Sequence, residues 1–332
     1  MADSKAILVV GETEKGKMAS ITRELLGGAR VLADQSGGDV CLLLLGEIAA
    51  ALASEGISLG ADKVYVATNA AYNEFSSDAY TELVSGLCAK IAPALCLMGQ
   101  TDLGCEVAPR VAARLGAALA MDCVEVVFDA ENGRFQQTRP AFGGKALSVL
   151  ASTKGLLQIN TVRAKSMQAA ALQDGRKGET VTIAEAPAPG VIKVKLLEAK
   201  KTEAEGIKLE DAKVIVSGGG GLGGTEGFAM IKELADLLGG VVGATRVPVD
   251  ENWVPLSMEI GQTGKIVSPE LYIAIGISGA AQHVTGCISS KKIVTINRDP
   301  DANMFKISDL GLVADYKAVV PILIEKLKAM NT

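Results

Sequence analysis

The sequence predicts an α/β protein of two domains, each a mostly parallel sheet flanked by helices, with antiparallel strands added to the first. Short apolar runs alternate with helical patterns along most of the 332 residues, the order typical of β-α-β units. Only 4% of the residues are aromatic although 48% are apolar, so Ala, Val, Leu and Ile form the core, as in many parallel sheets. The length suits two domains of roughly 150 residues each.

The first domain, residues 1–200, begins with strands and helices in alternation. We expect strands at 6–10, 40–45, 63–67 and 94–98, helices at 17–33, 48–55, 80–91 and 105–115, and an extended segment at 121–128. Such units pair their strands in parallel through right-handed crossovers. Residues 99–102 follow a strand, where a ligand could meet the sheet edge. They offer no phosphate loop, histidine or paired carboxylates, so we expect a structural role for them and no cofactor in this domain.

The rest of the first domain has a different pattern. Short runs that alternate or are rich in β-branched residues, separated by Gly and Pro, indicate antiparallel strands added to the first sheet. These runs lie at 134–138, 145–151, 155–161, 179–185 and 192–197. The chain is then charged between 198 and 210, as a domain linker would be. We place the boundary near Lys201.

The second domain, residues 201–332, returns to alternating strands and helices. Strands are expected at 213–217, 241–244, 271–277, 292–296 and 311–313, and a helix at 228–238. A polar or glycine-rich segment follows each strand. In an open parallel sheet these segments lie along the carboxyl edge, where ligands bind. Together they predict a site for a long, phosphorylated ligand, and therefore for a dinucleotide.

The glycine-rich turn at 217–225 lies between the first of these strands and the helix. Gly219, Gly221 and Gly224 satisfy the pattern G-x-G-x-x-G, which presents backbone N–H groups and a helix N-terminus to a phosphate. A run this rich in glycine also matches such patterns by chance. An NAD site would place Asp or Glu at the end of the second strand, but Thr245 and Arg246 stand there. That leaves a cofactor of the NADP type, with Arg246 on a 2′-phosphate, or a flavin.

His283 is the only histidine of the chain. It follows an apolar strand and the pair Ser278-Gly279, at the start of an expected helix. A lone histidine is usually a structural residue, but its place at the ligand edge favours a functional one. An imidazole there could donate a hydrogen bond to a carbonyl whose charge changes on reduction.

The net charge, the lengths of the apolar runs and the cysteine spacing argue against several classes of partner and site. A net charge of −5 argues against nucleic acid or an anionic membrane as the main partner. No apolar run approaches the ~18 residues of a membrane span, and the N-terminus reads as neither a signal nor a transit peptide, so we expect a cytoplasmic protein without membrane insertion. The six cysteines contain no C-x-x-C pair, and we expect no metal or iron–sulfur site.

Four segments of the second domain form a specific set. They are Val-Gly-Ala-Thr-Arg at 242–246, Ile-Gly-Gln-Thr-Gly-Lys-Ile-Val at 260–267, Pro-Glu-Leu-Tyr-Ile-Ala-Ile-Gly-Ile-Ser-Gly-Ala-Ala-Gln-His at 269–283, and Ile-Asn-Arg-Asp-Pro at 296–300. As a set they resemble the α subunit of electron-transfer flavoprotein, and the length and two-domain layout are similar too. The resemblance implies a noncovalent FAD in the second domain and a β subunit that packs against both domains.

Position by position, the resemblance implies roles for individual residues. Arg246 would lie over the flavin ring, with Thr263 near N5 and His283 facing O2, and these three would tune the redox chemistry. The cofactor would otherwise be held by Thr245 beside the phosphates, by Ile260, Gly261 and Gln262, by Ser278, Gly279, Ala280, Ala281 and Gln282 along the pyrophosphate and ribityl chain, and by Asn297 and Asp315 at the adenosine. Gly220 stands where the family commonly has Arg, so a cation near the phosphates is missing or comes from elsewhere.

The implied function is that of an electron carrier. Through a flavin semiquinone it would pass electrons between dehydrogenases, such as the acyl-CoA dehydrogenases of fatty acid β-oxidation, and a downstream acceptor. In a bifurcating complex, whose β subunit would hold a second FAD, it would be part of an NADH-dependent oxidoreductase. Two alternatives stay open: an NAD(P)(H)-binding domain of transhydrogenase type, and a nucleotide-sensing module without catalytic activity.

Overall fold

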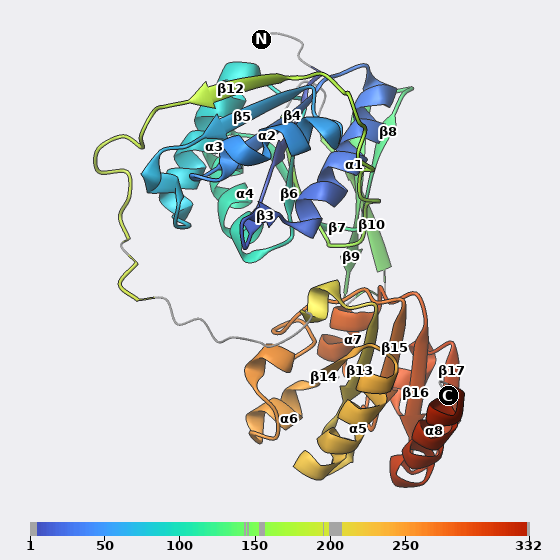
Figure 1. Ribbon diagram of the computed structural model, residues 1–332. Coiled ribbons are helices and arrows are strands. Elements are labelled where there is room, and N and C mark those ends of the chain that lie inside the picture. Colours follow the sequence, from blue (N-terminus) through green and yellow to red (C-terminus); the bar gives the residue numbers. More distant parts are fainter. Residues whose placement is uncertain are drawn as a thin grey trace. The chain divides into compact units, whose positions relative to one another are not determined.

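The computed structural model describes residues 5–142, 144, 146–152, 157–194, 196–198 and 208–330. Contacts divide the chain into two compact units, the first running to residue 199 without 142–144, and the second comprising 142–144 and 200–332. Lys201, at the expected boundary, lies outside the described residues. Each unit contains a parallel sheet covered by helices (Figure 1). The predicted α/β class with two parallel-sheet domains is confirmed.

The first unit is built on a seven-stranded parallel sheet in the order β12-β5-β4-β1-β6-β11-β7. Its strands are β1 (Ile7–Val10), β4 (Val40–Leu45), β5 (Lys63–Ala67), β6 (Leu95–Gly99), β7 (Ala118–Cys123), β11 (Gln158–Val162) and β12 (Glu179–Ile183). The central strands β1, β4 and β6 are buried at every position. Continuous apolar runs of this kind suit a sheet covered on both faces.

Four helices cover this sheet: α1 (Ser20–Ser36), α2 (Ala49–Ser58), α3 (Ser77–Ile91) and α4 (Asp102–Leu115). Side chains of α1 and α2 pack on one face and those of α3 and α4 on the other. The first helix starts later than expected, because 13–14 and 17–18 form a small hairpin of β2 (Thr13–Glu14) and β3 (Lys17–Met18). A short 3-10 helix, η1 (Ala70–Tyr72), precedes α3.

The antiparallel part differs from the prediction. β8 (Glu125–Asp129), β9 (Arg134–Ala141) and β10 (Ala146–Ala151) form a separate three-stranded sheet. The runs at 155–161 and 179–185, expected to be antiparallel, supply β11 and β12, which pair in parallel with their neighbours in the main sheet. Residue alternation reveals a strand but not its direction. The described residues of 192–197 form no strand, and Lys145 lies outside the description.

The second unit is a five-stranded parallel sheet in the order β14-β13-β15-β16-β17. The strands are β13 (Val214–Gly218), β14 (Val241–Ala244), β15 (Leu271–Ile275), β16 (Ile293–Asn297) and β17 (Leu310–Val313). The helices are α5 (Thr225–Leu237), α6 (Arg246–Asp250), α7 (Ala281–Cys287) and α8 (Tyr316–Met330), with short 3-10 helices η2 (Leu209–Asp211), η3 (Gly220–Leu222), η4 (Leu256–Met258) and η5 (Asn303–Ile307).

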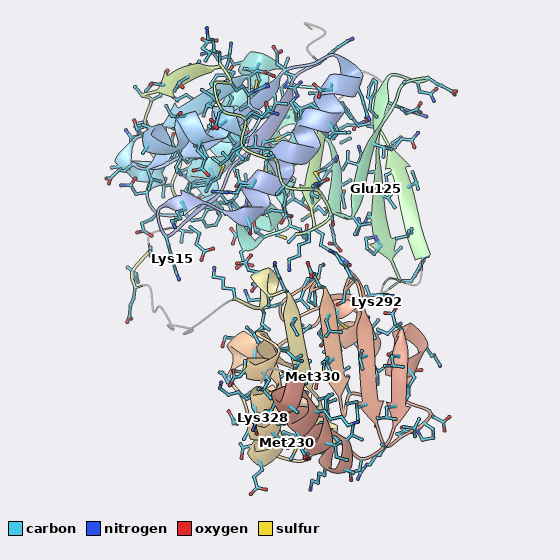
Figure 2. The ribbon with its side chains drawn as sticks, turned by 45° about the vertical axis from the view of Figure 1, so that its right-hand side comes forward. Lys15, Glu125, Met230, Lys292, Lys328 and Met330 are labelled. Carbon is cyan, nitrogen blue, oxygen red and sulfur yellow. The ribbon has the colours of Figure 1, made fainter. Side chains whose placement is uncertain are left out.

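Helices α5 and α8 cover one face of this sheet, and α7 with η5 covers the other. Helix α8 is joined to α5 by an ion pair of 2.6 Å between Lys328 (labelled in Figure 2) and Glu233. β13 lies between β14 and β15, so the chain reverses its direction across the sheet at this point. A crevice for a ligand forms at such a switch point, outside the carboxyl ends of the strands.

Candidate functional site

The glycine-rich turn after β13 is held against the segment that follows β15. The backbone N–H of Gly219 donates to Ile275 O, and that of Gly221 donates to Gly276 O, each at 3.0 Å. A Cβ atom would lie 2.3 Å from Gly276 O at Gly219 and 2.8 Å from it at Gly221. Only glycine permits this approach. The turn is therefore a packed structure and not a loose loop.

The segment after β15 offers free donors at the switch point. Within the described part of the chain, the backbone N–H groups of Ser278, Gly279 and Ala280 donate to no protein acceptor. Gly279 has φ 82° and its Cα lies so close to Met304 that a Cβ would be 2.2 Å from Met304 N. Ser278, Ala280, Ala281 and Gln282 are exposed. Successive free N–H groups at an accessible turn form an anion site, so this segment fits a pyrophosphate.

The segment after β14 reaches the same edge. Ile260 N donates to Ala244 O at 2.9 Å, at the end of β14, and Gln262 N donates to Gln282 O at 2.8 Å, on α7. The Thr263 hydroxyl donates to Glu259 Oε1 at 2.7 Å. Gln262 and Thr263 are exposed while Ile260 and Gly261 are buried. The structure therefore brings these four predicted residues together with Gln282.

His283 lies on the buried side of α7. Its side chain faces the core and is 6% exposed. Nδ1 lies 2.8 Å from Ile260 O and Nε2 lies 3.0 Å from the Tyr272 hydroxyl. Burial lowers the pKa of His283 to about 4. Both ring nitrogens have protein partners and the ring is neutral near pH 7. The predicted contact of His283 with the flavin O2 stays a prediction.

Thr245 and Arg246 follow β14 at the carboxyl edge of the five-stranded sheet, which is called the rim below. Thr245 N donates to Gly218 O at 3.0 Å, which ties this segment to the glycine turn. The Arg246 side chain is 70% exposed and its Nε lies 3.1 Å from Asp250 Oδ2. An exposed pair one helical turn apart contributes only about 0.5 kcal/mol, so Arg246 can leave it for a bound anion. A Cβ atom on Gly220 would lie 3.3 Å from Val247 Cγ1, next to Arg246 in the chain.

Asn297 and Asp315 stand at the ends of β16 and β17. The Asn297 amide donates to Ile277 O at 2.8 Å and accepts from Asp299 N at 3.0 Å. It therefore braces the segment that leads to Ser278. The Asp315 carboxylate accepts from Lys317 N at 2.9 Å in the first turn of α8. Their predicted contact with an adenosine stays a prediction.

Tyr272 makes a buried polar contact with His283 that the sequence argument missed. It is fully buried in the middle of β15, yet its hydroxyl needs a partner there. A tyrosine inside an otherwise apolar strand was the available signal. What the sequence did not reveal is that the partner is His283.

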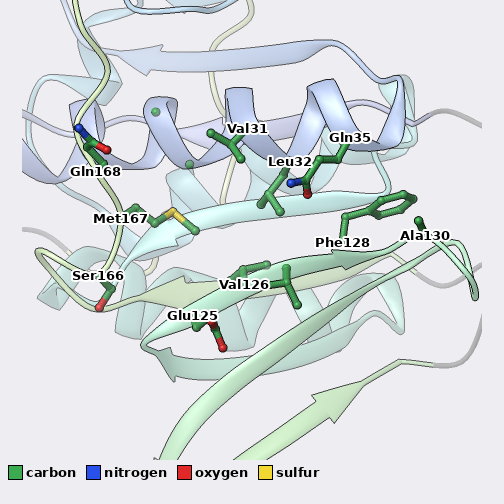
Figure 3. Close-up of a pocket in the computed structure, with 13 residues that line it drawn as sticks. Val31, Leu32, Gln35, Glu125, Val126, Phe128, Ala130, Ser166, Met167 and Gln168 are labelled. Carbon is green, nitrogen blue, oxygen red and sulfur yellow. The ribbon is translucent and has the colours of Figure 1, made fainter.

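Other possible sites were sought among the described residues. No group of side chains in them could hold a metal ion, and none of their helices is long and apolar enough to cross a membrane. A hollow of about 540 Å³ lies in the first unit between α1 and β8, lined mainly by apolar groups such as Val31, Phe128 and Met167 (Figure 3). A second, of about 350 Å³, lies against β12 and α3. The rim of the second unit is an open edge.

Two family models match the chain. The model described as "electron transfer flavoprotein domain" matches residues 7–188, and that described as "electron transfer flavoprotein FAD-binding domain" matches residues 208–288. A protein of Thermoanaerobacterium thermosaccharolyticum named electron transfer flavoprotein subunit alpha is 42% identical over 331 residues, covering 100% of both chains. The protein of the same name from Bacillus subtilis is 38% identical, covering 98% of each. Protein FixB of Clostridium saccharobutylicum is 37% identical, covering 99% of this chain and 98% of its own.

Proposed function

This chain belongs to the electron transfer flavoprotein family as an α subunit, and from that premise we propose that its second unit binds FAD along the carboxyl edge of the five-stranded sheet. The observation that carries the proposal is the run of free N–H groups at Ser278–Ala280 beside the packed glycine turn. It lies within the part of the chain that matches the FAD-binding family model. A pyrophosphate supplies the negative charge that such a run accommodates.

Different residues of the rim would hold different parts of this cofactor. Backbone groups at Ser278–Ala280 would bind the pyrophosphate, with Thr245 and Gly220 beside it. Gln262, Thr263 and Arg246 are exposed on the neighbouring segments and would meet the flavin end. Asn297 and Asp315 would meet the adenosine end. When bound, FAD supplies the electron-accepting ring, and the protein supplies its position and electrostatic surroundings.

The chain would act as one half of a heterodimer with a β subunit. The outer face of the antiparallel sheet β8–β10 supports this, because it exposes Val127 (41%), Leu147 (64%) and Val149 (62%). Glu125 and Val149 both pair with Thr138, so their side chains lie on the same face of the sheet. Val127 and Leu147 are each two residues further along the same strands and therefore point to that face too. An exposed apolar sheet face marks a protein contact. The first unit would thus serve assembly and not cofactor binding.

As a heterodimer the protein would carry electrons between a flavoprotein dehydrogenase, such as an acyl-CoA dehydrogenase, and a further acceptor. The names of its relatives, electron transfer flavoprotein subunit alpha and FixB, support electron transfer as the activity. The donor and acceptor are part of the proposal. Bifurcation would require a second FAD on the β subunit.

The test is to produce the chain together with its β subunit and to measure the absorbance spectrum and the flavin content of the purified complex. A yellow complex with one FAD per heterodimer that an acyl-CoA dehydrogenase reduces supports a carrier. Two FAD per heterodimer support a bifurcating complex. A colourless complex that takes up no added FAD but binds reduced pyridine nucleotide would overturn the proposal in favour of the NAD(P)(H)-binding alternative.

A further inference from the structure

The hollow between β12 and α3 belongs to the first unit, whereas the proposed cofactor site belongs to the second. Its volume is about 350 Å³, within the range of roughly 300–1,000 Å³ that is typical of small-molecule pockets. On one side it is bounded by β5 and β12, because Tyr65 and Val181 pair with each other and both line it. On the other side it is bounded by α3, and residues of the segment 185–188 complete the lining (Figure 1).

Much of the lining is apolar. It includes aliphatic side chains of α3 and β12, namely Leu83, Leu87, Val181 and Ile183. These side chains also belong to, or pack against, the core on this face of the seven-stranded sheet. Apolar surface that is covered by a ligand is removed from water, which favours binding. A molecule that fits this hollow therefore has an apolar body.

Tyr65 places a polar group in this apolar lining. The residue is 7% exposed, and its hydroxyl has no hydrogen-bond partner among the described residues. The oxygen is not closed off from the hollow. Burial raises the pKa of Tyr65, so the hydroxyl keeps its hydrogen near neutral pH and can donate it. Because a hydroxyl in an apolar environment is unfavourable without a partner, a ligand that offers an oxygen acceptor here gains affinity.

Gly86 leaves space on the helix side of the hollow. It lies in the interior of α3, where glycine is less favourable than alanine. A Cβ atom there would meet nothing within 4 Å. Leu83, Leu87 and Lys90 follow the same side of the helix and also line the hollow. The sequence thus keeps room beside the helix at a cost to helix stability.

The charged groups of the lining argue against an anionic ligand. Lys90 contributes one cation, whereas Glu82 and Glu185 contribute two carboxylates. Glu82 Oε2 accepts from the backbone N–H of Ala188 at 3.0 Å, which ties the segment 185–188 to α3. Since a surplus of negative charge repels an anion, a neutral molecule suits the hollow better than a carboxylate.

We propose that this hollow is a binding site for a small neutral molecule that has an apolar body and a carbonyl oxygen, which accepts a hydrogen bond from the Tyr65 hydroxyl. The apolar body would lie between α3 and β12, in the space beside Gly86. The inference does not depend on the proposed FAD site, because all the residues that carry it belong to the first unit.

Binding is tested with acetophenone, which carries a carbonyl oxygen on an apolar body, and with benzoate, an anion of similar size. Each probe is titrated into the full chain produced together with its β subunit, and binding is followed by ligand-observed NMR. We expect acetophenone to saturate with a Kd of about 1 mM or lower, which a ligand of this size can reach, and benzoate to bind at least about tenfold more weakly. No saturation by acetophenone up to ~10 mM, or equal binding of both probes, would overturn the inference.

Tyr65→Phe tests the hydrogen bond. The variant should bind acetophenone about fivefold more weakly, as expected for the loss of one hydrogen bond. Ethylbenzene has nearly the same shape but no oxygen, so it should bind equally to the variant and to the wild type. Unchanged binding of acetophenone, or equal losses for both probes, would overturn the role of Tyr65 and with it the inference.

Gly86→Leu tests the space itself. The new side chain should fill the hollow and weaken the binding of acetophenone more than about tenfold, while urea denaturation shows a first unit at least as stable as before, because leucine is a better helix former than glycine. Ala89→Leu is the matched control, since Ala89 is exposed on the same helix and lies outside the lining. It should bind acetophenone as the wild type does. Wild-type binding by Gly86→Leu, or equal losses in both variants, would place the probe elsewhere and overturn the inference.

Discussion

At the scale of single residues, the site depends on positions that have no side chain. Gly219 and Gly221 let the loops after β13 and β15 touch, and Gly279 lets the chain turn with φ 82° beside Met304. The sequence predicted a phosphate turn at these glycines but not what they contact, because contact between two loops depends on the order of strands in the sheet.

Gly219→Ala should abolish tight FAD binding, because the new methyl group would lie 2.3 Å from Gly276 O and force the two loops apart. We expect a Kd at least about 100-fold higher, which corresponds to about 2.7 kcal/mol, measured by fluorescence titration. Gly86→Ala is the matched control, since a Cβ there meets nothing within 4 Å. It lies in the interior of α3 and should leave binding unchanged and stabilise the first unit by up to about 1 kcal/mol.

Gly220→Arg should tighten FAD binding, because it brings a cation to a turn that has none. Gly220 is exposed, and the nearest obstacle to a Cβ is the side chain of Val247 at 3.3 Å, which can move. An exposed charge pair contributes up to about 1 kcal/mol, so the Kd should fall by about three- to fivefold at low salt. Gly220→Met, of similar length without charge, should bring no gain. Equal binding by both variants would show that the phosphates lie elsewhere.

Arg246→Ala should lower the reduction potential of the bound flavin without unfolding the protein. The guanidinium is 70% exposed and paired only with Asp250 in the described structure, so little stability depends on it. A cation close to a ring that gains negative charge favours reduction, and its removal should shift the potential by on the order of 100 mV. Redox titration measures this, and Arg246→Lys should retain most of the potential. An unchanged potential in the Ala variant would remove Arg246 from this role.

At the scale of elements, most strand positions were predictable, although the described residues of 192–197 form no strand. Strand direction was predictable in the alternating β-α-β parts but not for the runs at 155–161 and 179–185. β4 and β5 begin and end where the apolar runs indicated, because a fully buried strand needs apolar residues at every position. β11 and β12 were expected to be antiparallel, yet they join the parallel sheet. Their alternating residues reflect partial exposure in the case of β12, and the buried polar groups Gln158 and Asn160 in the case of β11.

Of the candidate site, the common sheet edge was predictable, and the roles of its residues stay predictions. The position of each polar segment after its strand indicated one common edge, and the parallel pairing of β13–β17 provides that edge. The direction in which a side chain points was not predictable. His283 faces inward from α7 toward Tyr272, because a helix that packs on a sheet buries one side and sequence position alone does not say which.

Helix α8 supports the glycine turn through one bond. The Tyr316 hydroxyl, at the start of α8, donates to Leu222 O at 2.8 Å, at the end of η3, and Tyr316 is 7% exposed. Tyr316→Phe leaves that carbonyl buried without its donor, so we expect a loss of about 1–2 kcal/mol in the free energy of unfolding, measured by urea denaturation. Tyr65→Phe, whose hydroxyl makes no hydrogen bond among the described residues, is the control and should change stability little. Equal effects would contradict the importance of the bond.

At the scale of the whole molecule, each unit has its own core. The clusters around β1 and β4 and those around β13 and β15 share no residue. The first unit combines its parallel sheet with the exposed antiparallel sheet β8–β10 (Figure 1). The second unit contains the five-stranded sheet, whose carboxyl edge is the rim. In the proposed assignment, binding of the cofactor at the rim and association through β8–β10 would involve different residues and could be altered separately.

Leu147→Lys with Val149→Lys should weaken association with the β subunit while leaving the second unit intact. Both side chains are more than half exposed, so the change costs the isolated chain little, but it places two charges in an apolar contact. We expect the Kd of the heterodimer to rise at least about 100-fold, or about 2.7 kcal/mol, as measured by analytical ultracentrifugation. Lysine at Val194, also exposed but outside the sheet, is the control. A heterodimer as tight as wild type would show that this face lies outside the contact.

The burial of the sole imidazole has a consequence for how the protein handles protons. Histidine is the one side chain that ordinarily buffers near neutral pH, and here its pKa is held at about 4. An electron that reached a cofactor at the proposed site would therefore find no imidazole ready to take up a compensating proton. Charge gained by the cofactor would have to be balanced by other cations or by the solvent, because this imidazole adds no charge that changes with pH near neutrality.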